Sequence, residues 1–350
     1  MRLTDRVELA LAGVRFDAPV QRNKGAGPSD DGHVTIDGVN AALPLSEASP
    51  FTVSGGLLHR DGRSLGIEII PVSRPKFYDL ATADGVPYRK IALLHGQDVL
   101  ATTVVQTCVR YPEDQRCRFC SIEESLNQGS TIAAKTPAQL AEVAEAAVRL
   151  DGVRQMVMTT GTTAGPDRGA RHLARCVRAV RETVPDLPVQ VQIEPPQDLT
   201  VIADLHDAGA GAIGIHVESM DDDVRRRWMP GKSTVPLEQY ERAWDEAVRV
   251  FGRNRVSTYL LIGLGEDPDS LVDAAAGLIA RGVYPFVVPM RPMAGTLARR
   301  DGTRPPSPEL VRRVTGEVAR LLRDAGMRGA DQEAGCAACG GCSALAAAGG

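Results

Sequence analysis

The chain has 350 residues, with 40 lysines and arginines against 44 aspartates and glutamates, and a formal net charge of −4. This near-balance excludes a protein that grips nucleic acid through a general basic surface. Hydrophobic residues make up 43% of the chain, which excludes a disordered protein. No apolar run approaches the roughly 18–20 residues of a membrane span, and the start MRLTDRVELALAG predicts no signal peptide. We therefore expect a cytoplasmic protein with neither a nucleic acid nor a membrane as partner.

The first 97 residues contain short apolar runs separated by clusters of Gly, Pro, Asp and Ser. The runs are HVTI (33–36), FTVSGGLL (51–58) and LGIEII (65–70). Short runs with turn residues between them predict strands and loops rather than long helices. We interpret residues 1–97 as a small α+β N-terminal domain.

From residue 98 onward, apolar β-branched segments alternate with amphipathic ones. Six strands are predicted, at 98–106, 154–160, 188–194, 211–217, 255–263 and 283–290. Helices are predicted between and after them, at 136–150, 169–184, 196–209, 236–252, 268–282 and 307–326. This alternation predicts parallel βαβ units. The pattern alone leaves open whether they form a flat doubly wound sheet or curl into a barrel.

The seven cysteines are mostly clustered: one group lies near residue 110 and another near the C-terminus, while Cys176 stands alone on a predicted helix. Clustered thiols in a protein expected to be cytosolic indicate metal or redox chemistry. The predicted metal ligands are Cys108, Cys117, Cys120, Cys336, Cys339 and Cys342. Three thiolates from one loop leave one corner of a cubane iron–sulfur cluster without a protein ligand. A structural zinc site is the alternative.

Polar and glycine residues follow every predicted strand. Among them are Thr160-Gly161-Thr162, Glu194, His216 and Glu218. The carboxyl ends of parallel strands meet at one face, where ligands bind. We therefore expect these residues and the first cysteine group to share one pocket.

The segment Cys117-Arg118-Phe119-Cys120 resembles the C-x-aromatic-C motif of the radical S-adenosylmethionine (SAM) superfamily. Over about residues 98–300 the chain is similar to the biotin synthase-like branch. The resemblance implies a [4Fe–4S] cluster on Cys108, Cys117 and Cys120, with SAM chelating the fourth iron. The eight residues between Cys108 and Cys117 exceed the usual spacing. A longer loop still closes, because closure entropy grows only logarithmically with length.

The resemblance also implies roles in SAM binding. Phe119, Leu261 and Met293 would flank the adenine, and Arg242 would pair with the SAM carboxylate. Glu218 would bond the ribose hydroxyls. Backbone carbonyls of the glycine-rich segment after the second strand would bind the amino group. The full implied set is Phe119, Thr160, Gly161, Thr162, Glu194, Glu218, Arg242, Leu261 and Met293.

With this resemblance we predict an α/β fold, a partial (β/α)6 TIM-type barrel over residues 98–300. A small α+β domain over 1–97 precedes it, and a C-terminal helix and cysteine tail over 301–350 follow. We expect the Ala- and Gly-rich tail from Gly335 to be flexible apart from its cysteines. The C-x2-C-x2-C spacing of those cysteines predicts a second [4Fe–4S] cluster, with a zinc knot or a loose tail as alternatives.

The implied activity is reductive cleavage of SAM to a 5′-deoxyadenosyl radical, which takes hydrogen from a small-molecule substrate. The reaction needs a one-electron donor such as flavodoxin or ferredoxin. Two alternatives stay open: biotin synthase-like sulfur insertion with the second cluster as donor, and a non-catalytic zinc-binding protein. A Rossmann oxidoreductase is disfavoured, because no G-x-G-x-x-G follows a strand. The whole chain, including YDLATADGVPYRKIALLHG (78–96), also resembles a bacterial radical SAM family encoded beside nitrilases.

Overall fold

The computed structural model describes residues 1–17 and 32–349. Its larger sheet has seven strands in the order β13-β12-β11-β10-β9-β8-β7, so each strand lies beside its neighbour in sequence. The strands are β7 (Leu93–His95), β8 (Val99–Thr103), β9 (Gln155–Thr159), β10 (Val189–Ile193), β11 (Ala212–Ile215), β12 (Val256–Ile262) and β13 (Val283–Pro289). β8 to β13 pair in parallel, and β7 is antiparallel to β8. β7 and β13 are the two edges, so the barrel is open, as predicted.

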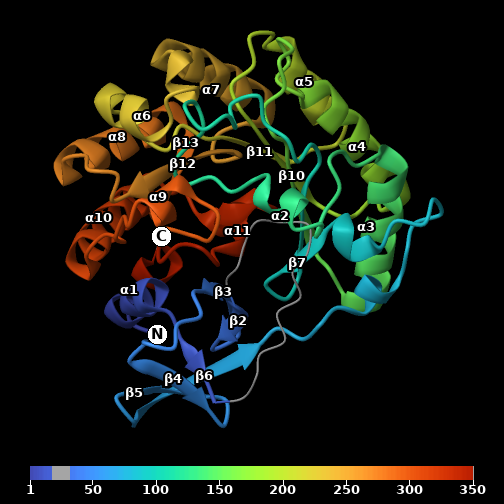
Figure 1. Cartoon of the computed structure of the whole chain (residues 1–350). Helices are drawn as coiled ribbons and strands as arrows, with labels where there is room; N and C mark the ends of the chain where they lie inside the picture. Colours follow the sequence, from blue (N-terminus) through green and yellow to red (C-terminus); the bar gives the residue numbers. More distant parts are fainter. Residues whose placement is uncertain (18–31, 350) are drawn as a thin grey trace.

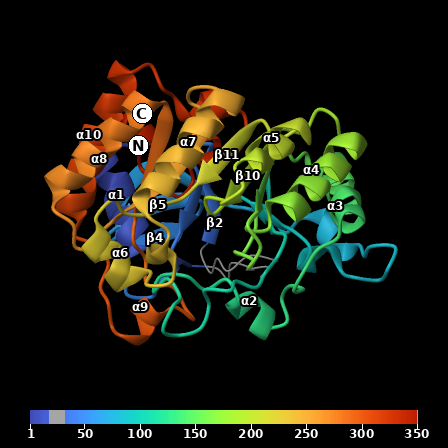
Figure 2. The same ribbon diagram turned by 90° about the horizontal axis from the view of Figure 1, so that it is seen from above.

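Helices cover the outer face of this curled sheet (Figures 1 and 2). They are α3 (Pro137–Asp151), α4 (Ala170–Thr183), α5 (Thr200–Asp207), α7 (Leu237–Phe251), α8 (Pro268–Arg281) and α10 (Pro308–Asp324). The caps explain where α3 begins and ends: Thr136 and Gln139 form a capping box, and Gly152 ends the helix in the left-handed conformation. Short elements join them: α2 (Glu124–Asn127), α6 (Asp222–Trp228), α9 (Leu297–Arg300), and the 3-10 turns Lys76–Asp79, Tyr88–Lys90, Lys232–Thr234 and Gly329–Gln332. In the described part of the chain, no helix is long and apolar enough to cross a membrane.

The N-terminal residues form α1 (Leu3–Ala12) and a second sheet with the order β1-β4-β5-β6-β2-β3. Its strands are β1 (Arg15–Phe16), β2 (Gly32–Ile36), β3 (Val39–Leu43), β4 (Phe51–Ser54), β5 (Leu57–Arg60) and β6 (Arg63–Pro71). This sheet has its own small core, which includes Leu9, Val34 and Phe51. α1 packs against α10, so the N-terminal unit lies beside the C-terminal elements (Figure 1).

The C-terminal tail is ordered, and our expectation of a flexible tail is wrong. It forms α11 (Cys336–Cys339) and a 3-10 turn (Ala346–Ala348) that pack against the barrel. The amide of Gly335 donates to Gln155 Oε1 at 2.8 Å, and the Ser343 hydroxyl donates to the carbonyl of Val287 at 2.6 Å. A Cβ on Gly335 would lie 2.1 Å from the Gln190 side chain. Small residues in the tail therefore allow a close fit rather than mobility.

Candidate active site at the carboxyl ends of the barrel strands

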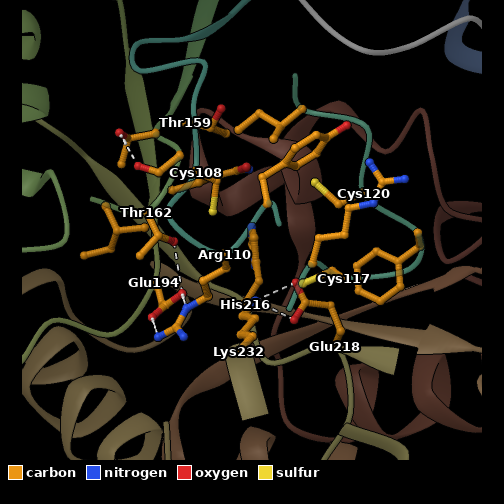
Figure 3. Close-up of a pocket in the computed structure, with 18 residues that line it drawn as sticks. Cys108, Arg110, Cys117, Cys120, Thr159, Thr162, Glu194, His216, Glu218 and Lys232 are labelled. Atoms are coloured by element: carbon orange, nitrogen blue, oxygen red, sulfur yellow. Dashed lines mark hydrogen bonds and ion pairs between the residues drawn. The ribbon is translucent and has the colours of Figure 1, made fainter. Parts of the chain in front are cut away.

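The loop after β8 brings the first cysteine group to one cavity. Tight turns hold the thiols: the Tyr111 amide donates to the Cys108 carbonyl at 2.9 Å, and the Cys120 amide donates to the Cys117 carbonyl at 3.0 Å. Cys108, Cys117 and Cys120 are free thiols that line a cavity of about 190 Å³. Figure 3 shows their side chains around the same space.

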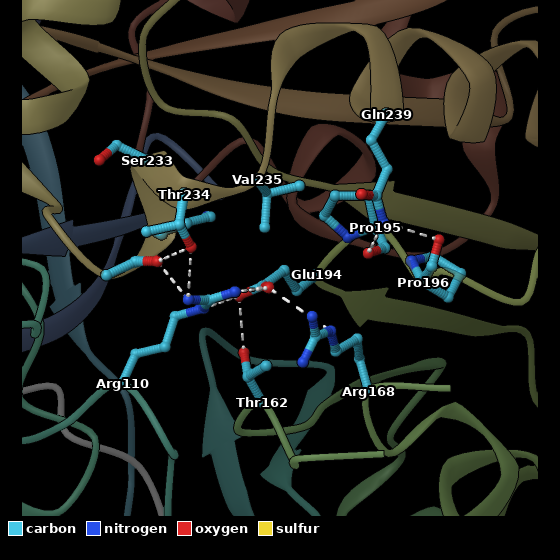
Figure 4. Close-up of polar contacts among 12 residues, drawn as sticks. Arg110, Thr162, Arg168, Glu194, Pro195, Pro196, Ser233, Thr234, Val235 and Gln239 are labelled. Carbon is cyan, nitrogen blue, oxygen red and sulfur yellow. Dashed lines mark hydrogen bonds and ion pairs between the residues drawn. The ribbon is translucent and has the colours of Figure 1, made fainter. Parts of the chain in front are cut away.

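A buried ion pair fixes the long segment between Cys108 and Cys117. Arg110 donates to both carboxylate oxygens of Glu194, at 2.7 and 2.8 Å, and the Thr162 hydroxyl donates to the same carboxylate at 3.0 Å. Arg110 also bonds the Gly231 carbonyl (Figure 4). The side chains of Arg110 and Glu194 are 11% and 4% exposed. This bidentate geometry is strong and directional, so the eight-residue spacing does not leave Cys108 on an unanchored loop.

A second ion pair, between Lys232 and Glu218, lines the same cavity. Lys232 Nζ lies 2.5 and 2.8 Å from the two carboxylate oxygens of Glu218, and both side chains are largely buried. Burial alone would lower the pKa of Lys232, but the Glu218 carboxylate outweighs it and raises that pKa above its ordinary value. Lys232 is therefore a cation beside the cysteine loop (Figure 3).

His216 is held as a neutral hydrogen-bond donor. Its ring stacks on Tyr259 with 4.1 Å between centroids, and its Nδ1 accepts from the Tyr259 amide at 3.2 Å. Burial, with a smaller contribution from Lys232, lowers the pKa of His216 to about 3. The proton of the neutral ring is therefore on Nε2, which is buried without a partner in the described part of the chain.

A larger cavity of about 480 Å³ adjoins the first. The two share the lining residues Phe119, Cys120, Ile122, Thr159, Gln192, His216 and Glu218. Leu261, Val288 and Met293 contribute to its mostly apolar wall. His95 and Cys342 also line it, so one chamber reaches from the loop cysteines to a tail cysteine.

Most of the predicted site residues lie together. The smaller cavity is lined by Cys108, Cys117, Phe119, Cys120, Thr160, Gly161, Thr162, Glu194 and Glu218, and the larger one also by Leu261, Met293 and Cys342. Cys336 and Cys339 line neither cavity. Across residues 1–17 and 32–349, no three His, Cys, Asp or Glu side chains converge as ligands of a single metal ion.

The structure corrects the prediction for Arg242. This residue is exposed on α7 and lines neither cavity. The buried face of α7 is formed instead by Tyr240, Ala243 and Trp244, and Trp244 Nε1 donates to the Ile215 carbonyl at 2.9 Å. The helical period thus turns Arg242 toward solvent. The arginine and lysine side chains that line the smaller cavity are those of Arg110, Arg116 and Lys232, and Arg291 lines the larger one.

The two ion-pair partners at the site, Arg110 and Lys232, were not predicted from the sequence. Arg110 lies between two predicted ligands, Cys108 and Cys117, and this position is the only signal that could have indicated it. Lys232 follows α6 in the sequence MPGKS, where no periodicity or spacing marks it. Gly161 has a structural reason for its identity, because a Cβ there would lie 2.0 Å from the Thr107 carbonyl oxygen.

Glu266 follows β12 at the edge of this region, and its carboxylate accepts from the Ser219 hydroxyl. Burial raises the pKa of Glu266 from 4.5 to about 7, and the Ser219 bond only partly opposes this. The folded protein therefore retains a proton that the unfolded chain has already released between these two values. It follows that the free energy of unfolding decreases as pH rises through this window.

We expect this decrease to be about 3 kcal/mol for the Glu266 carboxyl. Urea unfolding of wild type and of Glu266→Gln between pH 4.5 and 8 tests it, because the amide does not titrate. The variant should lose that part of the pH dependence. An unchanged slope in Glu266→Gln would assign the dependence to other groups.

The chain thus forms an open α/β barrel. Three thiols, two buried ion pairs and two adjoining cavities lie at the carboxyl ends of its strands. The sequence pattern of the radical SAM superfamily matches residues 114–276. Lipoyl synthase from Halorhodospira halophila is 30% identical over 275 residues, which cover 69% of this chain and 79% of that protein. The chain belongs to the radical SAM superfamily and is an enzyme of that class.

Two further similarities are more partial. Bacteriochlorophyllide c C-7(1)-hydroxylase from Chlorobaculum limnaeum is 25% identical over 257 residues, which cover 68% of this chain. The chain spans 63% of the length of that relative. The FeFe-hydrogenase maturase HydG from Carboxydothermus hydrogenoformans has a TM-score of 0.49 and 18% identity, with 66% of this chain and 52% of that one covered.

Superfamily membership implies a [4Fe–4S] cluster and SAM. The residues present fit both groups. Three free thiols line one cavity, as thiolate ligation of a cluster requires. The buried Nε2–H of His216, which has no partner within residues 1–17 and 32–349, lies where the two cavities meet and can donate a hydrogen bond to a bound molecule. Membership of the radical SAM superfamily contradicts the alternative of a non-catalytic zinc-binding protein.

Proposed function

We propose that the protein cleaves SAM in the smaller cavity and removes a hydrogen atom from a small molecule bound in the larger one. When bound and reduced, the cluster and SAM supply a 5′-deoxyadenosyl radical, which attacks an unreactive C–H bond. The observation that carries the proposal is that the two cavities adjoin at Phe119, Cys120 and His216. A radical formed in one would meet its substrate without crossing solvent.

In this proposal Cys108, Cys117 and Cys120 hold the cluster. Phe119 and the segment Thr160-Gly161-Thr162 contact SAM, as the family resemblance implies. Glu194 and Glu218 act within ion pairs, because Arg110 and Lys232 already engage their carboxylates. Lys232 Nζ has a third donor beyond the two bonds to Glu218, and we assign it the carboxylate of SAM in place of Arg242.

The chain also prepares the substrate side of the site. Leu261 and Met293 line the larger cavity with apolar surface, which excludes water from a reactive intermediate. His216 offers its Nε2–H at the junction, and its low pKa keeps the ring neutral across the physiological range. We assign His216 to positioning an acceptor atom of the substrate or of SAM.

We further propose a second [4Fe–4S] cluster on Cys336, Cys339 and Cys342. Cys336 and Cys342 pack against the core of the barrel, Cys339 lies with Cys336 on the short helix α11, and Cys342 lines the larger cavity. That position, together with the similarity to lipoyl synthase, favours sulfur insertion with the second cluster as donor as the alternative reaction. Loss of sulfide from the tail cluster during turnover would favour sulfur insertion over hydrogen abstraction alone.

The experiment that tests the proposed function is anaerobic reconstitution followed by product analysis. Full-length protein with SAM and dithionite, or with reduced flavodoxin or ferredoxin as one-electron donor, should release 5′-deoxyadenosine and methionine in equal amounts. Iron-free protein is the control and should release neither. Recovery of intact SAM from fully loaded protein, with each reductant and with candidate substrates present, would contradict the proposal.

A further inference from the structure

The sulfur of Cys336 receives two hydrogen bonds inside the barrel. The Tyr259 hydroxyl donates to Cys336 Sγ at 2.7 Å, and Gln192 Nε2 donates to the same atom at 3.2 Å. The sulfur of a neutral thiol is a weak acceptor, whereas a thiolate is a strong one. Two buried donors directed at one sulfur are therefore surroundings that suit a negatively charged, metal-bound atom.

Arg6 of α1 places a buried positive charge at the same tail. Its Nη2 donates to the Gly341 carbonyl at 2.7 Å, directly before Cys342. The residue is 6% exposed, and its Nη1 is buried without a hydrogen-bond partner among the residues that the structure describes. Within residues 1–17 and 32–349, no carboxylate pairs with Arg6. A buried guanidinium without a carboxylate is costly unless another anion compensates it.

We propose that Arg6, Tyr259 and Gln192 form the outer shell of the tail metal centre and raise its reduction potential. The inference rests on the second cluster proposed above. Reduction adds negative charge to a cluster. Hydrogen bonds to its sulfurs and a nearby cation stabilise the more negative state. The N-terminal helix thus tunes a centre whose ligands lie more than 300 residues away in sequence, since Arg6 and Gly341 are 335 residues apart.

The shell also orients the tail relative to the first site. Tyr259 contacts Cys336 through its hydroxyl and stacks its ring on His216, which lines both cavities. The tail centre is therefore one tyrosine and one histidine removed from the loop-cysteine cavity. Tyr259 acts through the Cys336 thiol and Arg6 through the Gly341 carbonyl beside Cys342, so both are positioning residues.

The test uses full-length protein with Cys117→Ala and Cys120→Ala, which isolates the tail centre. Iron and sulfide counts first establish that about four irons remain. An EPR-monitored redox titration then compares this protein with added Tyr259→Phe, Arg6→Gln or Arg6→Lys. At a fixed applied potential we expect Tyr259→Phe and Arg6→Gln each to lower the ratio of reduced to oxidised cluster about tenfold, a shift of 59 mV for a one-electron couple.

Two controls make the result specific. Arg6→Lys retains the positive charge and should shift the ratio less than Arg6→Gln. Tyr284→Phe removes the hydroxyl of another buried barrel tyrosine, which bonds no cysteine in the described part of the chain, and should leave the ratio unchanged. If Arg6→Gln does not fold, the reduction potentials of Tyr259→Phe and Arg6→Lys test the inference in its place. Absence of iron at the tail would overturn both the second cluster and this inference, whereas iron with unshifted potentials would overturn the inference alone.

Discussion

Replacement of Cys117 or Cys120 by alanine is expected to abolish release of 5′-deoxyadenosine, with a loss of at least about 100-fold. Each variant removes one of three thiols that line the same cavity, and a cluster held by two thiolates has no stable place there. The iron content should fall from about eight to about four per chain. Iron and sulfide assays and product analysis by chromatography measure both effects on the same samples.

Cys108 gives the sharper version of this prediction. It precedes the segment that matches the superfamily pattern, which begins at residue 114, and eight residues separate it from Cys117. The structure places it on the cavity with the other two, and its amide donates to Glu123 Oε1 at 3.1 Å. We therefore expect Cys108→Ala to lose as much iron and activity as Cys117→Ala.

Cys176→Ala is the matched control for all three cysteine variants. Cys176 is buried in the core on α4 and lines neither cavity, so the variant should keep both its iron and its activity. If Cys108→Ala behaves like Cys176→Ala instead, the third ligand of the cluster must be another residue. That outcome would remove the assignment of the three-thiol site while leaving superfamily membership intact.

The alternation of parallel strands and helices was predictable from sequence because its signals are local and repeated. The choice of a barrel over a flat sheet rested on the family resemblance. Six β-branched segments alternate with amphipathic ones. The Thr136 side chain marks the start of one helix, and Gly152 marks its end because glycine readily adopts the left-handed backbone conformation. The location of the site followed from the same pattern, since the carboxyl ends of parallel strands meet at one face. The structure places Glu194 and Glu218 there for this reason.

The ion partners of those carboxylates were not predictable, because pairing between distant residues leaves no periodic trace. Arg110 and Glu194 are 84 positions apart, and Lys232 begins a three-residue 3-10 turn that carries no periodic signal. The prediction for Arg242 was wrong for a different reason. A local resemblance assigned this residue to SAM, but its position on α7 lies on the exposed face of the helix. The prediction of a flexible tail was wrong because an Ala- and Gly-rich composition usually indicates flexibility. Here the small size of Gly335 allows it to pack against the Gln190 side chain.

Arg110→Met is expected to lower the free energy of unfolding by about 3–5 kcal/mol. The change keeps most of the side-chain volume but leaves the Glu194 carboxylate, 4% exposed, without its bidentate partner. Arg168 remains 3.9 Å away and compensates only in part. Reversible urea unfolding of the metal-free protein measures the loss. The loop that carries Cys108 should also loosen, so iron retention after reconstitution should fall in the same variant.

The double variant Arg110→Met/Glu194→Leu separates the pair from the rest of the site. Removing both charges replaces a buried ion pair with apolar contact, so we expect the double variant to be less destabilised than the sum of the two single ones. Arg281→Met provides the surface comparison, because its pair with Asp245 is 30% and 58% exposed and should contribute under about 1 kcal/mol. Equal losses in Arg110→Met and Arg281→Met, or strict additivity in the double variant, would show that the Arg110–Glu194 pair does not anchor the cysteine loop.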